Sequence, residues 1–146
     1  MAAEKGRIIK NPLEICEWLK EYKRVVVVGV SPKADRDSHI IAQYLLDAGY
    51  TMIPVRPKQD VLLGQKAYGS LQEIVDANIS VDIIDFFRRS DQIPAHVDEA
   101  IATGAKLIWM QNGIEHMKAA ERFMEAGIDV IMNRCIKVDH QNCPGL

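Results

Sequence analysis

Cysteine is scarce in this sequence: the 146 residues contain three, Cys16, Cys135 and Cys143. An odd number without a Cys-x-x-Cys pair is not the pattern of a disulfide framework or of a zinc site. The four histidines are also scattered, without the spacing typical of metal ligands. We therefore expect reduced thiols, no bound metal and a cytoplasmic protein.

Long apolar runs are absent as well. A helix that crosses a bilayer needs about 20 apolar residues, whereas the longest run here, around residues 25–30, has the length of a strand. Residues 1–10 contain no apolar segment typical of a secretory signal. The net charge of −2 provides no basic excess for a nucleic-acid backbone. These absences argue against a membrane or a nucleic acid as the partner.

Short apolar runs are what the sequence does have. Five of them are rich in β-branched residues and alternate with segments of helical spacing, at 25–30, 51–56, 81–87, 106–111 and 129–134. Runs that are short and apolar throughout suit strands buried on both faces of a parallel sheet. The alternation predicts an α/β, Rossmann-like, open parallel five-stranded sheet with helices on both faces. Residues 1–146 form one domain in this interpretation, with 136–146 as a short polar tail, loose or docked on the surface.

Signals for helix ends support this division of the chain. Asn11 before Pro12 predicts a first helix over 12–22. Ser70 and Glu73 form a capping box before a helix at 71–77. A glycine follows each of three helical segments, where the left-handed conformation ends a helix at no cost from a Cβ atom: Gly49, Gly104 and Gly127.

The exit of the first strand has the residues that a phosphate site needs. Ligands of open parallel sheets bind at the carboxyl ends of the strands, where strand order reverses. Gly29 allows close approach to the backbone, Ser31 offers a hydroxyl, and a helix expected to start near Ser38 offers free N–H groups. Lys33 and Arg36 add positive charge. The loop matches neither GxGxxG nor the P-loop pattern, and the alternative is a glycine turn with a solvated charged loop.

The end of the second strand separates the candidate nucleotides. NAD sites carry an acidic residue there, which binds the ribose hydroxyls, but this sequence has Val55, Arg56, Pro57 and Lys58. Two cations favour a ribose that bears a phosphate, as in coenzyme A or NADP. The alternative is that both cations point into water.

Together the motifs resemble the coenzyme A-binding domain family over about residues 12–138. The resemblance lies in Gly29-Val-Ser-Pro, Arg36-Asp-Ser38, Tyr44-Leu45-x-x-x-Gly49-Tyr50, Ile53-Pro54-Val55-x-Pro57, Tyr68-Gly-Ser70-Leu71, Val81-Asp82-Ile-Ile-Asp85-x-Phe87-Arg88-Arg89-Ser90, Gly104-Ala105-Lys106 and Asp129-Val-Ile-Met-Asn-Arg134-Cys135. The family includes small stand-alone proteins. The nucleotide-binding domain of the succinyl-CoA synthetase alpha subunit is a more distant relative.

The resemblance implies a Rossmann-like fold and a set of coenzyme contacts. The pyrophosphate would lie over the loop from Gly29 and Val30 to Ser38, with Ser31, Arg36 and Ser38 as phosphate contacts. Val55, Arg56, Pro57 and Lys58 would line the adenosine side, and Phe87, Arg88 and Arg89 would flank the ligand. The sequence departs from the family at Arg56, where relatives usually carry Asn, and at Asn133, where many carry Asp.

Three further positions have both a chemical and a structural interpretation. Gln111 and Asn112 leave the fourth strand at the same edge, where they would contact the pantetheine arm or form an ordinary turn. His116 is either a candidate catalytic group or a residue at the start of a helix. No base partner is visible for it in the sequence, which argues against the catalytic role. Cys135 stands between cations that favour its thiolate, so it would form a mixed disulfide with the coenzyme or remain a free thiol.

The leading hypothesis is a non-catalytic protein that sequesters, senses or presents coenzyme A or acyl-CoA. The alternatives are an NADP-binding reductase-like protein, an accessory subunit of an acyl-CoA ligase, and a redox module that acts through Cys135. Beyond the nucleotide, the expected partners are another protein or a second copy of the chain.

Overall fold

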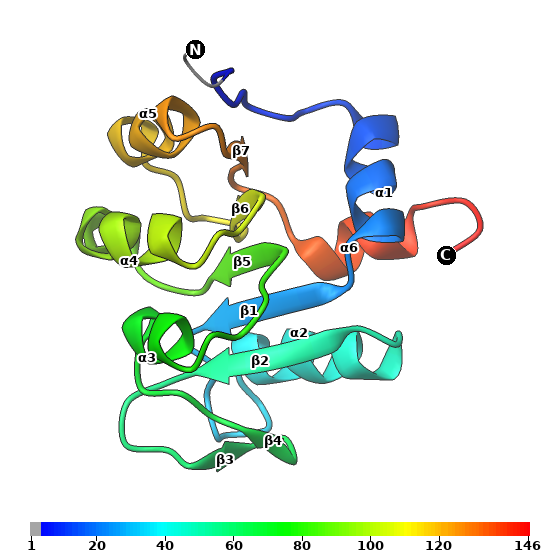
Figure 1. Cartoon of the computed structure of the whole chain (residues 1–146). Coiled ribbons are helices and arrows are strands. Elements are labelled where there is room, and N and C mark those ends of the chain that lie inside the picture. The colour runs from blue at the N-terminus through cyan, green and yellow to red at the C-terminus, as the bar shows by residue number, and fades with distance from the viewer. Residues whose placement is uncertain (1–3) are drawn as a thin grey trace.

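A five-stranded parallel sheet forms the centre of the computed structural model, which describes residues 4–146 (Figure 1). Its spatial order is β2-β1-β5-β6-β7. The strands are β1 (Arg24–Val28), β2 (Thr51–Val55), β5 (Ile83–Phe86), β6 (Leu107–Met110) and β7 (Asp129–Ile131). This confirms the predicted fold class and all five strands, each of which ends one to three residues before its apolar run does. The chain winds outward from β1 to β2 and then returns to β5, so strand order reverses between β1 and β5.

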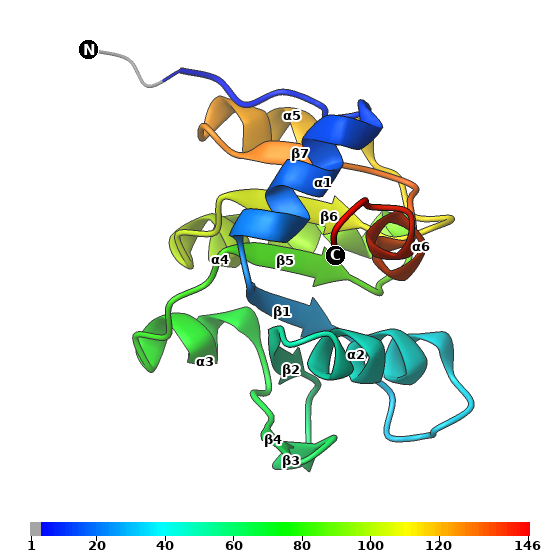
Figure 2. The ribbon, with the colours of Figure 1, turned by 90° about the vertical axis from the view of Figure 1, so that its right-hand side faces the viewer.

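Helices cover both faces of the sheet (Figure 2). On one face lie α1 (Pro12–Glu21), α2 (Asp37–Asp47) and α6 (Ile136–Gln141). On the other lie α3 (Leu71–Asp76), the 3₁₀ helix η1 (Ser90–His96), α4 (Val97–Ala102) and α5 (Met117–Glu125). Because successive strand side chains point to opposite faces, Val25 and Val27 pack under the first group and Val26 and Val28 under the second.

The predicted helix ends are present. The Asn11 side chain accepts a hydrogen bond from the N–H of Leu13 at 2.9 Å, and Ser70 Oγ accepts one from the N–H of Glu73 at 3.2 Å. Each of these bonds satisfies an N–H group that has no partner within its own helix. The three glycines named above all have positive φ, between 79° and 92°.

Three short elements were not predicted. A hairpin of β3 (Val61–Leu62) and β4 (Gln65–Lys66) follows β2, and its turn places Leu63 and Gly64 at φ of 54° and 73°. The last residues contain α6, which packs beside α1 and α2. Residues 136–146 are therefore docked on the protein, with Ile136 and Cys143 buried.

The expectation of three reduced thiols is wrong for this structure, because Cys16 and Cys143 form a disulfide with a Cα–Cα distance of 5.5 Å. The two residues are 127 positions apart in the sequence and meet because α1 packs against α6. Sequence spacing contains no information about that contact. Cys135 is the free thiol among the described residues. Within the same residues, no helix has both the length and the apolar character needed to cross a membrane.

Candidate functional site

Three adjoining cavities follow the carboxyl edge of the sheet. The α3–α4 cavity, of 280 Å³, lies between the end of β2 and helices α3 and α4. The loop cavity, of 360 Å³, lies at the loop between β1 and α2. The α2–α6 cavity, of 500 Å³, lies between these two helices. Gly29 and Arg56 line the first two cavities, and Asp37 and Phe87 line the last two, so the cavities form one groove over the point where strand order reverses.

The loop cavity is positively charged. Lys33, Arg36 and Arg56 line it together with one acidic side chain, Asp37. The N-terminus of α2 opens at the same place, and the Arg36 side chain makes no capping hydrogen bond there. Free N–H groups at a helix start, with cations beside them, attract phosphate and other anions.

The serines of this loop hold its shape. Ser38 Oγ accepts a hydrogen bond from the N–H of Ser31 at 2.9 Å, and Ser31 Oγ accepts one from the N–H of Lys33 at 3.1 Å. The Ser31 carbonyl lies 2.8 Å from Nδ1 of His39. Both hydroxyls line the cavity, but as acceptors they already serve the loop itself.

Gly29 is required by a contact within the protein. Its φ is +96°, and a Cβ atom there would lie 2.7 Å from the carbonyl oxygen of Phe87. Its N–H donates to the Val55 carbonyl at 2.8 Å. The close approach predicted at this glycine is thus made by the end of β5, and any side chain would force β1 and β5 apart.

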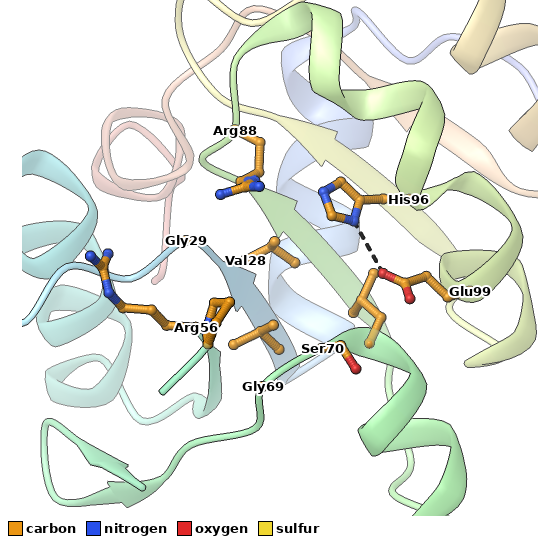
Figure 3. Close-up of a pocket in the computed structure, with 11 residues that line it drawn as sticks. Val28, Gly29, Arg56, Gly69, Ser70, Arg88, His96 and Glu99 are labelled. Carbon is orange, nitrogen blue, oxygen red and sulfur yellow. Dashed lines mark hydrogen bonds and ion pairs between the residues drawn. The ribbon is translucent and has the colours of Figure 1, made fainter. Parts of the chain in front are cut away.

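The α3–α4 cavity has apolar walls and charged ends (Figure 3). Its walls are built by Val28, Val55, Pro57 and Leu71. Figure 3 shows Arg56 at one end and His96 with Glu99 at the other, with Arg88 projecting between them. Nδ1 of His96 lies 3.1 Å from Oε1 of Glu99. Nε of Arg88 is buried and has no hydrogen-bond partner among residues 4–146.

The α2–α6 cavity combines apolar walls with amide groups. Its lining includes Ile40, Ile41, Phe87, Ile114 and Val138, with Gln111, Asn112 and Cys135 among them. The Gln111 side chain is buried, and its Oε1 accepts a hydrogen bond from the N–H of Ile136 at 3.1 Å. Gln111 therefore ties the end of β6 to the start of α6.

Most of the residues predicted for the site meet in the groove. Those that line at least one of the three cavities are Gly29, Ser31, Arg36, Ser38, Val55, Arg56, Pro57, Phe87, Arg88, Gln111 and Asn112. Three others line none of these cavities. Val30 is buried in the core, Lys58 is exposed at a φ of 65°, and the exposed Arg89 lies 3.6 Å from Asp91.

Some of the groove was missed, and one candidate has a structural role. His96 and Glu99 had no sequence signal beyond an i, i+3 spacing, which puts two side chains on one face of a helix. His116 is the N-cap of α5, and its Nδ1 accepts a hydrogen bond from the N–H of Ala119 at 3.1 Å.

Asp85 lies outside the groove, as a buried carboxyl group in the core. Its register partners are Val27 and Trp109, which places its side chain on the face covered by α1, α2 and α6. Neither carboxyl oxygen has a hydrogen-bond partner within the described residues. Burial raises the pKa of Asp85 well above its ordinary value, because the charged form would lose its hydration.

A family model that matches most of the chain identifies the family of this protein. The model of the CoA binding domain matches residues 23–141, which include every strand of the sheet and all three cavities. The chain belongs to the CoA-binding domain family. This confirms the resemblance drawn from the motifs above.

Two relatives of this CoA-binding domain match over nearly their whole length. Protein YneT of Bacillus subtilis is 43% identical over 134 residues, which cover 90% of this chain and 97% of YneT. A solved structure of a protein from Pyrococcus horikoshii has a TM-score of 0.86 and 35% identity, and the match covers 93% of this chain and 94% of that one. The acetyl-coenzyme A synthetase 1 of Ca. Korarchaeum cryptofilum shares the fold, with a TM-score of 0.68 and 23% identity over 80% of this chain and 27% of that one.

Proposed function

We propose that this protein binds coenzyme A along the groove, without catalysing a reaction on its own. The adenosine would occupy the α3–α4 cavity, the pyrophosphate the loop cavity, and the pantetheine arm the α2–α6 cavity. The single observation that carries the proposal is the continuity of the three cavities through shared residues, Gly29 and Arg56 at one junction and Phe87 at the other. Membership of the family supports the choice of ligand.

The charges in the groove support an anionic ligand in its middle. Three cations against one acid line the loop cavity, beside the uncapped start of α2. Arg56 reaches both the loop cavity and the α3–α4 cavity, so one guanidinium can contact a phosphate on the ribose as well as the pyrophosphate. Arg88 lines the α3–α4 cavity as well and supplies a second guanidinium there.

Titration calorimetry with coenzyme A, dephospho-coenzyme A, NADP and NAD tests the proposal. We expect coenzyme A to bind most tightly, and dephospho-coenzyme A, which lacks the 3′-phosphate, to bind about tenfold more weakly or worse. The variant Arg56→Gln should narrow this difference, whereas Lys58→Gln, which removes an exposed cation outside the cavities, should change it less. Tight NADP binding without a response to coenzyme A would overturn the proposal.

The non-catalytic role is tested with the full chain and possible reactants. We expect no release of free thiol from acetyl-coenzyme A and no oxidation of NADPH when either is incubated with the protein. Turnover of one of them, lost in the Arg88→Gln variant, would replace the binding role with an enzymatic one.

A further inference from the structure

The α3–α4 cavity is polarised along its length. Arg56 lies at the end that joins the loop cavity, and Glu99 lies with His96 at the opposite end (Figure 3). A nucleotide with its phosphates near the cations must therefore place its base toward Glu99. Between the two ends, Val28, Val55, Pro57 and Leu71 offer apolar surface to the faces of a flat ring, and Arg88 projects into the same space.

Glu99 is held in place and retains acceptor capacity. Its Oε1 lies 3.1 Å from Nδ1 of His96, and the His96 ring stacks at a tilt on Phe86 with centroids 5.8 Å apart. The side chain of Glu99 is 24% exposed and that of His96 is 20% exposed. An ionised carboxylate has two oxygens and accepts several hydrogen bonds, so one contact with His96 leaves room for a donor from a ligand.

From this arrangement we infer that Glu99 is a specificity-determining residue that accepts a hydrogen bond from the exocyclic amino group of adenine. The inference rests on the proposed binding of coenzyme A, whose base is adenine. The amino group at C6 is a donor, whereas hypoxanthine carries a carbonyl oxygen at the same position. A carboxylate cannot donate to that oxygen, and the two would repel each other. His96 is a positioning residue that directs the carboxylate into the cavity.

The test compares ADP with IDP, which differ at C6 and the ring nitrogen beside it. We expect the wild-type chain to prefer ADP by about tenfold or more, since the carboxylate that accepts a hydrogen bond from the amino group of adenine faces a repelling carbonyl oxygen at the same position of hypoxanthine. In Glu99→Gln the side-chain amide can donate to the carbonyl of hypoxanthine, so the preference should shrink to about threefold or less. His96→Ala should reduce the preference in the same direction.

Charge provides an independent check on this result. Removal of a carboxylate from a groove that binds polyphosphate strengthens the attraction for every such ligand. A loss of ADP affinity in Glu99→Gln therefore opposes the electrostatic trend and reports on the base contact. The matched control is Asp98→Asn on the same helix, which removes the same charge from an exposed side chain paired with Arg122 at 2.7 Å. That variant should keep the wild-type preference for ADP.

The outcomes separate the inference from the proposed function. If coenzyme A binds but the wild-type protein does not distinguish ADP from IDP, or Glu99→Gln keeps the full preference, the role of Glu99 is refuted while coenzyme A binding stands. If neither coenzyme A nor ADP binds, the proposed function itself fails. Unfolding temperatures of the variants are measured alongside to show whether each variant is folded. The ratio of the two affinities is itself unaffected by a loss of folded protein.

Discussion

The two faces of the sheet are built from different kinds of interaction. Under α3, α4 and α5 the core is a continuous apolar cluster that includes Phe86 and Phe123, both fully buried. The other face, under α1, α2 and α6, contains the disulfide. It also contains the buried polar and charged residues found in the described chain: Ser38, Asp85, Gln111 and His140.

This difference makes the α1/α2/α6 face the more sensitive of the two to pH and oxidation. Apolar burial stabilises the α3/α4/α5 face, and it changes little with pH or oxidation. On the α1/α2/α6 face, the hydroxyl of Tyr44 lies 2.6 Å from Nδ1 of His140, and burial lowers the pKa of His140 while it raises that of Asp85. The same face forms the walls of the α2–α6 cavity, so a change in conditions there also reaches the proposed pantetheine site.

The largest effect is expected on the apolar face. Phe123→Ala removes a fully buried ring from the cluster and leaves a cavity, so the free energy of unfolding should fall by about 3 to 5 kcal/mol. Urea denaturation measures the change. Because no titratable or redox-active group is involved, the loss should be equal at pH 5 and pH 8 and unaffected by a reductant. A loss that varied with either condition would contradict the contrast between the faces.

The disulfide gives the next largest effect, on the opposite face. Cys16→Ser removes a cross-link between residues 127 positions apart, and the unfolded chain then gains conformational freedom. We expect the free energy of unfolding to fall by about 2 to 4 kcal/mol. A reductant should bring the wild-type protein to the same stability and leave the variant unchanged.

Cys135→Ser is the matched control for this prediction, since Cys135 is a free, half-buried thiol near the same helix. Its stability should stay within about 0.5 kcal/mol of the wild type. The Cys16→Ser variant should also lose more affinity for coenzyme A than for ADP. The reason is that α6 lines the α2–α6 cavity but neither of the other two cavities. Equal losses of affinity for both ligands would show that the disulfide has no specific effect on the proposed pantetheine site.

The sequence predicted the features that depend on local patterns. Short apolar runs indicated all five strands of the sheet, and Asn11 and Ser70 indicated helix starts. The carboxyl edge followed from the parallel topology, because consecutive parallel strands all end on the same side. That single rule was enough to bring residues as distant as Arg36 and Gln111 into one groove.

Features that depend on tertiary contacts were missed. The disulfide requires α1 to lie beside α6, and the β3–β4 turn places Leu63, which is not a typical turn residue, at a positive φ. His96 and Glu99 belong to an ordinary helical spacing, and their place in the groove depends on which cavity the helix faces. Lys58 and Arg89 show the reverse case, since a cation near the right strand end can still point away from the groove.

The smallest effect over a single pH unit is expected from Asp85, and it appears as a pH dependence. Because burial raises the pKa of Asp85, the folded protein keeps a proton on this carboxyl that the unfolded chain releases above its ordinary pKa of about 4. This contribution therefore favours the folded state most at low pH. It is lost as the pH rises, by at most about 1.4 kcal/mol per pH unit until the pH exceeds the folded pKa.

Asp85→Asn removes the titrating proton but keeps the shape of the side chain. The free energy of unfolding of this variant should therefore not fall with rising pH in the way described for the wild type. We expect the variant to gain stability relative to the wild type as the pH rises from 5 to 8, measured by urea denaturation at each pH. The matched control is Asp82→Asn, whose carboxylate already accepts a hydrogen bond from the N–H of Arg24 and lies 3.4 Å from Nζ of Lys106. Loss of these contacts should lower stability without a gain at high pH. If Asp85→Asn behaved in the same way, the carboxyl would be ionised in the folded protein, and the α1/α2/α6 face would have to contain a partner for its charge.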